Sequence, residues 1–169
     1  MEQFEHAGQW RLQLTEHTAA VGALDWCPFS RELLVSGAGT TDQTVKVWNA
    51  NSGKMLNSTP TGSQVCAVLW SRDYHHQREL VSAHGGNRTE LNVWSYQRND
   101  SNCNGMQKLH EVLSHTKRVI DLAMSPDGDV ASVSADETIR FWNIFSRLSA
   151  PKKHFRTTSL PEFGIPPIR

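Results

Sequence analysis

Two sets of residues combine a histidine, a serine and an aspartate, side chains that can serve in general-base catalysis or metal binding. In each set a tryptophan follows the aspartate by six residues. The first set with its tryptophan is His17, Ser36, Asp42 and Trp48, and the second is His115, Ser134, Asp136 and Trp142. Catalysis, metal binding and a purely structural role all fit these types, so the rest of the sequence must decide between them.

The other histidines and the cysteines lack the spacing of a metal site. His75 and His76 flank a turn before His84, and Cys27, Cys66 and Cys103 form no CxxC pair. An odd number of cysteines also argues against a disulfide framework. The sequence has no Gly-rich phosphate loop, no nucleophile elbow and no usefully spaced pair of carboxylates. We therefore expect no enzyme activity, no metal and no cofactor.

The composition is that of a folded protein inside the cell. Of the 169 residues 38% are hydrophobic, and 17 Lys and Arg balance 17 Asp and Glu. Zero net charge argues against a nucleic-acid partner, because phosphate-binding domains usually carry a basic surplus. No apolar run is long enough to span a bilayer, and the first residues lack the basic start and apolar core of a signal peptide. We expect no membrane partner.

Tryptophans mark an internal repeat. Trp48, Trp94 and Trp142 lie 46 and 48 residues apart, and each closes a short segment of alternating character. Two further strand-like segments precede each tryptophan. They cover residues 21–26 and 32–36 in the first unit, 65–70 and 79–82 in the second, and 119–124 and 129–134 in the third. Short strands at regular spacing, with turn formers such as Pro126-Asp127-Gly128 between them, predict an all-β fold.

This repeat resembles the WD-repeat β-propeller, whose unit is a four-stranded antiparallel blade with an early histidine and a late tryptophan. In that family the four residue types form a buried hydrogen-bond chain, which implies a structural role for His17 and His115. We expect a partial WD-repeat propeller of about three blades. The expected parts are a remnant outer strand of a preceding blade (1–14), three blades (15–60, 61–112 and 113–146) and an extended tail (147–169).

The middle unit departs from the pattern. When it is aligned on its Val65 and Trp94, the histidine position holds Thr61 and the aspartate position holds Arg88. Of the four types only Ser82 and Trp94 remain, so we expect no complete chain in this unit. It also contains a polar stretch, residues 97–107, that we predict to be a flexible surface loop.

Three stretches outside these positions resemble the Fizzy and Fizzy-related activators of the anaphase-promoting complex. They are residues 15–21 with 37–42, residues 61–66, and residues 124–128 with 135–142. That family also lacks the histidine and aspartate of the corresponding blade, and it has a Gly-rich segment there like His84-Gly85-Gly86-Asn87. The resemblance implies a non-enzymatic adaptor in the nucleus and cytoplasm. Such an adaptor recruits degron-bearing proteins, cyclins among them, for ubiquitin-dependent degradation in the mitotic or meiotic cell cycle.

The resemblance also assigns residues to degron recognition. In the family, the positions that match Thr40, Gln64 and Arg118 line the site for the Lys-Glu-Asn degron. The chemistry fits, because Arg118 can pair with a carboxylate while the other two offer hydrogen bonds. The position that matches Glu137 contacts the arginine of the destruction-box degron at the edge of the last blade.

The last two residues, Ile168 and Arg169, match the docking tail by which the family binds a tetratricopeptide-repeat subunit of the ligase. Such a tail offers a terminal carboxylate, a guanidinium and one apolar side chain. Pro166 and Pro167 before it favour an extended backbone.

The family's propeller has seven blades and a long N-terminal arm, whereas this sequence has three blades. An incomplete gene model, a truncated paralogue and a fragment that assembles with itself or another chain all remain open. Three blades alone leave two unpaired sheet edges and an exposed apolar flank. The alternative function is therefore that of a truncated or degenerate paralogue that acts only as a WD-repeat protein-interaction scaffold.

Overall fold

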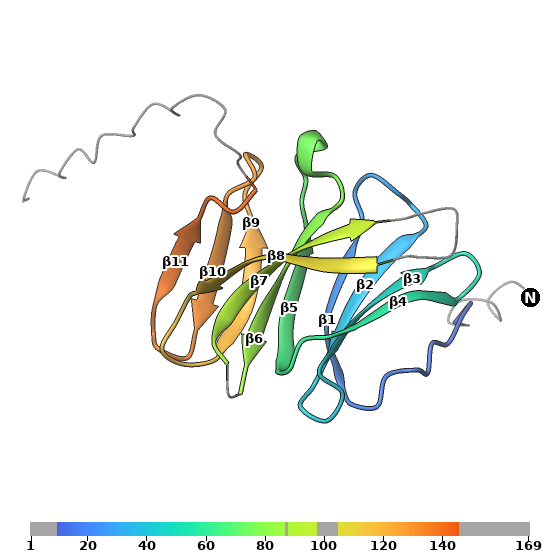
Figure 1. The fold of residues 1–169 in the computed structure, drawn as a ribbon, viewed down its shortest axis with the longest axis horizontal. Helices are drawn as coiled ribbons and strands as arrows, with labels where there is room; N and C mark the ends of the chain where they lie inside the picture. Colours follow the sequence, from blue (N-terminus) through green and yellow to red (C-terminus); the bar gives the residue numbers. More distant parts are fainter. Residues whose placement is uncertain (1–9, 87, 98–104, 146–169) are drawn as a thin grey trace, which may run out of the picture.

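The computed structural model describes residues 10–86, 88–97 and 105–145, which form three antiparallel β-sheets side by side (Figure 1). The first sheet has the order β1-β2-β3-β4, with strands Val21–Trp26, Leu33–Ala38, Thr44–Asn49 and Lys54–Pro60. The second has the order β5-β6-β7-β8, with strands Gln64–Trp70, Glu79–Gly85, Glu90–Gln97 and Gly105–Leu113. The third has the order β11-β10-β9, with strands Val119–Met124 (β9), Val130–Ser134 (β10) and Ile139–Trp142 (β11). The predicted all-β fold is confirmed.

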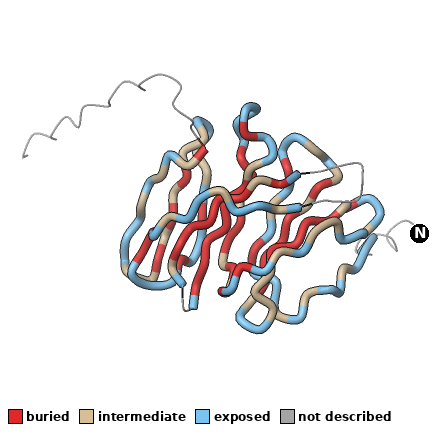
Figure 2. Tube along the Cα trace, in the orientation of Figure 1, coloured by how far each residue is buried: buried red, intermediate tan, exposed pale blue. Residues whose placement is uncertain are grey.

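The inner strand of each later sheet packs on the sheet before it. Strand β5 contacts β1 and β2, and strand β9 contacts β5 and β6. Valines dominate the two apolar clusters between the sheets, among them Val35, Val47 and Val68 in the first and Val81 and Val93 in the second. Figure 2 shows buried residues along these strands and mostly exposed residues along β8. Each fully buried valine contributes about 1.5 kcal/mol or more, so the packing of sheet on sheet stabilises the arrangement.

Two glycines make the close approach of neighbouring sheets possible. A Cβ atom added at Gly37 would collide with the side chain of Val65 on β5. A Cβ atom at Gly85 would lie 2.7 Å from the Sγ atom of Cys66 and 3.3 Å from the Cβ atom of Arg118. Neither position has room for a side chain, so the close packing of the sheets requires glycine at both.

The N-terminal segment differs from the prediction. Described residues 10–14 form no strand, because the described chain contains no partner strand beside them. Instead, Nη2 of Arg11 donates a hydrogen bond to the carbonyl oxygen of Ala50 at 2.7 Å. The side chains of Leu12 and Leu14 lie beside Gly53 in the β3–β4 turn. The segment is thus fastened to the first sheet by side chains and not by strand pairing.

The predicted polar loop is shorter than expected. Gln97 belongs to β7 and pairs with Gly105 of β8, so residues 105–107 are strand and not loop. Gln97 and Gln107 are polar, which suits strands with one face in water, and composition alone does not distinguish such strands from a loop. Residues 98–104 and the predicted tail 147–169 lie outside the described residues.

Both flanks of the three-sheet arrangement expose apolar side chains. On the β1 side Leu24 is 61% exposed and Trp26 is 51% exposed. On the side of the third sheet Ile139 is 65% exposed and Phe141 is 79% exposed. Within the described chain β11 also has a strand partner on one side only.

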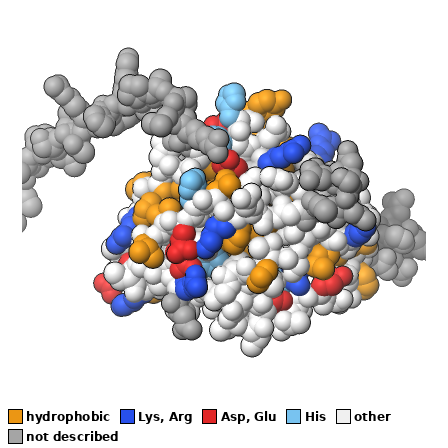
Figure 3. Space-filling model, in the orientation of Figure 1, with side chains coloured by type: hydrophobic (Ala, Val, Ile, Leu, Met, Phe, Trp, Pro, Cys, Tyr) orange, Lys and Arg blue, Asp and Glu red, His pale blue; other side chains and the backbone are white. Residues whose placement is uncertain are grey.

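Charges on the surface are mixed. On the face shown in Figure 3, acidic and basic side chains stand beside one another, and Lys108 pairs with Glu111 at 2.6 Å on β8. Among residues 10–86, 88–97 and 105–145, no helix is long and apolar enough to cross a membrane. The same ranges contain no group of three or more His, Cys, Asp or Glu side chains arranged to hold a metal ion.

We predict that Gly85→Ala lowers the free energy of unfolding by about 1–3 kcal/mol, because the added methyl group must displace Cys66 and Arg118. Urea unfolding monitored by circular dichroism measures the change. Gly22→Ala is the matched control, since nothing lies within 4 Å of a Cβ atom there. Equal stabilities of the two variants would contradict the close-approach explanation.

Candidate functional site

A hydrogen-bond chain runs through the first sheet and fastens its loops. Nε1 of Trp48 donates to Oγ of Ser36 at 2.7 Å, and Nε2 of His17 lies 2.7 Å from the same oxygen. Nδ1 of His17 lies 3.1 Å from Oδ2 of Asp42, which also accepts the backbone N–H of Thr18 at 2.7 Å. The chain thereby ties the segment before β1 to the β2–β3 turn.

The order of donors in this chain indicates which nitrogen of His17 carries the proton. The Ser36 hydroxyl accepts from Trp48 and can donate its single proton to Nε2 of His17, so the ring proton lies on Nδ1 and faces Asp42. Burial raises the pKa of Asp42, but hydrogen bonds from Thr44, Thr18 and His17 outweigh burial and hold it well below its usual range. Asp42 is therefore an ionised anchor for two loops.

The third sheet repeats the chain. Nε1 of Trp142 donates to Oγ of Ser132 at 2.8 Å, and Nε2 of His115 lies 2.7 Å from that oxygen. Nδ1 of His115 lies 2.9 Å from Oδ2 of Asp136. The hydrogen bond from the Thr138 hydroxyl is the largest influence that lowers the pKa of Asp136 below its usual range.

The serine predicted for this chain, Ser134, is wrong, and Ser132 takes its place. Trp142 pairs with Val130 across the β10–β11 ladder, and Ser132 is the next residue of β10 on the same face. Ser134 is two residues too far, and its hydroxyl donates to the carbonyl oxygen of Arg118 at 3.0 Å. In the first sheet, too, the serine stands two residues beyond the partner of the tryptophan.

The second sheet contains a histidine in its chain that the sequence alignment missed. Nε1 of Trp94 donates to Oγ of Ser82 at 2.7 Å, and Nε2 of His84 lies 2.8 Å from the same oxygen. His84 comes from the same strand as Ser82, two residues along and hence on the same face. The signal available in the sequence was this Ser-x-His spacing within a strand.

His84 is fully buried, and no carboxylate of the described residues forms a hydrogen bond or ion pair with it. Burial, followed by the charge of Lys108, lowers the pKa of His84 to about 4. Arg88, which stands at the predicted aspartate position, lies 3.5 Å from Glu90 instead. His84 is thus a neutral substitute for the histidine and aspartate of the other sheets.

Three predicted site residues meet at the end where the inner strands begin. Gln64 opens β5 and pairs with Gly85, and Arg118 immediately precedes β9. Thr40 and Gln64 line one hollow together with Gly85 and Gly86. Because Gly85 also lies against the Cβ atom of Arg118, all three side chains belong to one neighbourhood. We name Thr40, Gln64 and Arg118 the polar cluster.

The polar cluster is an exposed, shallow surface. Its hollow has a volume of about 50 Å³, the space of one or two water molecules, so a ligand would lie across it and bury no side chain. The side chain of Arg118 is exposed, and no carboxylate of the described chain pairs with it. Cys66 stands beside this surface, where burial raises the pKa of its thiol and the charge of Arg118 partly opposes that effect.

Glu137 lies outside the hollow of the polar cluster. It occupies the β10–β11 turn with a left-handed φ of 69°, and its backbone N–H donates to the carbonyl oxygen of Ser134 at 3.1 Å. Gln43 has the matching place and a φ of 53° in the β2–β3 turn. The side chain of Glu137 is exposed, so it is available to a partner.

His76, whose spacing to His75 and His84 predicted no metal site, lies away from the polar cluster. His76 pairs with Glu79 at 3.0 Å beside the turn after β5, at the other end of that strand. Ile168, Arg169 and Cys103 lie outside the described residues.

Comparison with known proteins identifies the family. The family model for the WD domain, G-beta repeat, matches residues 8–49 and 106–143. The protein named "Cell division cycle 20.1, cofactor of APC complex" of Arabidopsis thaliana is 48% identical over 146 residues, which cover 86% of this chain and 30% of that protein. The protein named "FIZZY-RELATED 3" of the same plant is 43% identical over 167 residues, 97% of this chain and 32% of that protein. The chain belongs to the Fizzy and Fizzy-related family.

A solved structure shows the same fold. A chain in the crystal structure of the mitotic checkpoint complex is 36% identical, with a TM-score of 0.73 over 80% of this chain and 40% of that chain. The WD-domain matches leave out residues 50–105 of this Fizzy-family chain, which include most of the middle unit and His84. The chain spans about a third of the length of the curated relatives it matches.

We predict that His84 makes stability fall as the solution is acidified. Its pKa is about 4 in the folded chain against an ordinary 6.5, so the unfolded chain takes up a proton first as the pH falls below about 6.5. The free energy of unfolding falls by about 3 kcal/mol by the time the pH reaches 4. Urea unfolding at a series of pH values above the range of Asp42 and Asp136 measures it.

The variant His84→Gln should lose most of this pH dependence, whereas His75→Gln should keep it, because His75 is exposed. An unchanged pH slope in His84→Gln would show that another group is responsible.

Proposed function

We propose that this chain is a non-enzymatic substrate-recognition adaptor and activator of the anaphase-promoting complex, a ubiquitin ligase. The observation that carries the proposal is its identity of 48% over 146 residues to a relative named as a cofactor of that complex. Because the chain spans about a third of such relatives, the proposal concerns the share of recognition and docking that these three sheets and the tail would perform.

We assign recognition of the Lys-Glu-Asn degron to the polar cluster. Arg118 offers an exposed guanidinium without a carboxylate partner in the described chain, which suits the glutamate of the degron. Gln64 offers an amide beside it, and the loop of Thr40 is held by a hydrogen bond from Nε2 of Gln43 to the Thr40 carbonyl oxygen at 2.8 Å. A shallow surface with fixed loops suits a peptide that lies across it.

We assign Glu137 to the arginine of the destruction box. Its tight turn is fastened at both sides, since Asp136 accepts the N–H of Thr116 at 3.1 Å and that of Thr138 at 3.1 Å. An exposed carboxylate on a fixed turn can pair with a guanidinium at little cost in conformational entropy.

We predict that Arg118→Glu weakens binding of a Lys-Glu-Asn peptide by at least about tenfold, or about 1.4 kcal/mol, because attraction to the degron glutamate becomes repulsion. Fluorescence anisotropy with a labelled peptide measures the affinity. Lys117→Glu is the matched control, because it makes the same change of charge at the neighbouring exposed residue. This variant should lose much less affinity for the peptide. If the two variants bind alike, the assignment of Arg118 is wrong.

Deletion of Ile168 and Arg169 should abolish pull-down of the ligase core, because the deletion removes the guanidinium and the apolar side chain and moves the terminal carboxylate. Extension of the chain by one glycine after Arg169 tests the carboxylate separately. Undiminished pull-down by the deletion variant would count against docking through this tail. Pull-down combined with an absence of any degron binding would favour the alternative of an interaction scaffold.

A further inference from the structure

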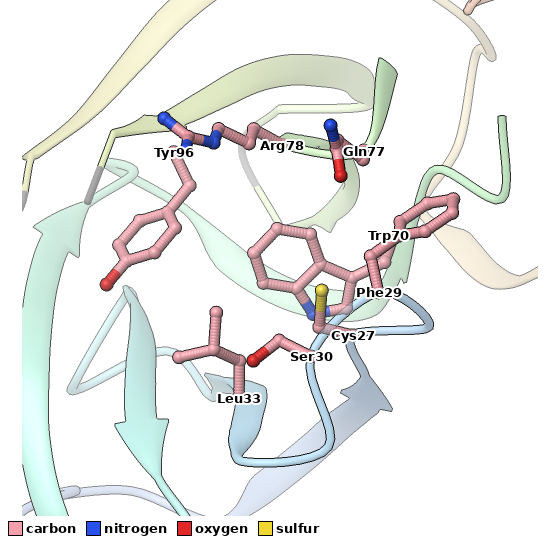
Figure 4. A pocket seen from close by; sticks show the side chains of 8 residues that line it. All are labelled: Cys27, Phe29, Ser30, Leu33, Trp70, Gln77, Arg78 and Tyr96. Atoms are coloured by element: carbon pink, nitrogen blue, oxygen red, sulfur yellow. The ribbon is translucent and has the colours of Figure 1, made fainter. Parts of the chain in front are cut away.

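A second hollow lies between the first and second sheets, at the other end of the strands from the polar cluster (Figure 4). Strand β5 runs from Gln64 in the cluster to Trp70 at this hollow, a distance of about 20 Å along the strand. Asp25 of β1 accepts the backbone N–H of Trp70 at 2.7 Å and joins the two sheets beside it. The two hollows therefore open at separate places on the molecule.

Apolar and aromatic side chains form the walls of this hollow, which we name the aromatic hollow. Phe29, Leu33, Trp70 and Tyr96 line it, and the rings of Trp70 and Tyr96 meet edge to face at 6.0 Å. Its volume is about 170 Å³, and a cavity of about 150 Å³ is large enough for benzene. One phenyl or leucine-sized side chain fits inside.

A buried hydrogen-bond donor faces the aromatic hollow. Trp70 is 1% exposed, and its Nε1 atom has no acceptor among residues 10–86, 88–97 and 105–145. Figure 4 shows the nitrogen edge of the indole turned toward Cys27 and Ser30. Since buried donors are nearly always paired in folded proteins, this N–H group is available to an acceptor oxygen from beyond the described residues, which a bound partner can supply.

The rim adds positive charge and exposed rings. Arg78 and Gln77 line it and are exposed, no aspartate or glutamate lines it, and Arg78 pairs with no carboxylate of the described chain. Phe29 meets Tyr74 edge to face at 6.1 Å, and Tyr74 is 72% exposed. Exposed aromatic side chains beside an unpaired guanidinium are typical of surfaces that bind other proteins.

We propose that the aromatic hollow binds an acidic linear peptide of a partner protein. The peptide inserts one aromatic or leucine-sized side chain and presents a carbonyl or carboxylate oxygen to Nε1 of Trp70. An acidic residue next to the inserted side chain pairs with Arg78. This site is distinct from the polar cluster, and it does not depend on the function proposed above.

The test uses the full chain labelled with ¹⁵N and the peptide acetyl-Glu-Phe-Glu-amide. The indole N–H resonance of Trp70, assigned with Trp70→Phe, should shift on titration and saturate. Acetyl-Glu-Ala-Glu-amide and acetyl-Lys-Phe-Lys-amide should each bind at least about tenfold more weakly, because one lacks the inserted ring and the other has the wrong charge.

Two arginine variants provide the matched pair. Arg78→Ala should weaken binding about threefold, as expected for an exposed ion pair. Arg72→Ala removes another exposed arginine that does not line the hollow, and it should leave the affinity unchanged. Ser30→Phe should fill the hollow and abolish the shift, while dispersed resonances of the other indoles verify that the variant is folded.

Four outcomes would overturn the proposal. They are the absence of a saturable shift at millimolar peptide, equal binding of the alanine-centred peptide, equal losses in the two arginine variants, and a Trp70 resonance that moves on dilution without peptide. The last outcome would mean that a second copy of the chain occupies the hollow.

Discussion

The three sheets depend on one interaction: the indole N–H group of the tryptophan on the third strand of each sheet donates a hydrogen bond within that sheet. The acceptor for Trp48, Trp94 and Trp142 is in each case a serine hydroxyl on the second strand of the same sheet. A serine oxygen that accepts from an indole still has a proton to donate, so a histidine nitrogen becomes its natural partner. In the outer two sheets that histidine then reaches an aspartate in the next turn. The hydrogen-bond chain that starts at the tryptophan therefore fixes the loops at the surface.

In the middle sheet the hydrogen-bond chain is shorter, running from Trp94 through Ser82 to His84, and other hydrogen bonds hold the loops. Thr61, at the position of the missing histidine, donates its backbone N–H and its hydroxyl to the carbonyl oxygen of Gln43, each at 2.9 Å. Ser63 donates to the carbonyl oxygen of Gly85. The segment before β5 is thus fastened to the turn of the first sheet and to its own second strand. This arrangement leaves Gln64 and the two glycines after His84 at the junction of three sheets, where the polar cluster forms.

Features fixed by local sequence were predictable, and features fixed by pairing were not. Alternation and the spaced tryptophans located the strands, because both are properties of neighbouring residues. Ser132 and Ser134 lie on the same face of one strand, and only the register with Trp142 distinguishes them. His84 was missed because it approaches its serine from a different element than His17 does. The proximity of Thr40, Gln64 and Arg118 depends on the packing of sheets, so only the family resemblance brought them together in advance.

The two ends of the strands differ in how completely their polar groups are satisfied. At the end of the polar cluster, hydroxyls and carboxylates of the loops bind backbone groups, and the surface that results is rigid and shallow. At the other end Trp70 is as deeply buried as Trp48, but its Nε1 atom makes no hydrogen bond to any described residue, Ser30 of the same hollow included. Serine hydroxyls accept the indole N–H groups of three tryptophans. The N–H group of Trp70, which lines the hollow, is the donor that a bound partner can pair with. Trp70 thus packs between two sheets with its ring, while its Nε1–H group remains able to donate one hydrogen bond to a bound partner.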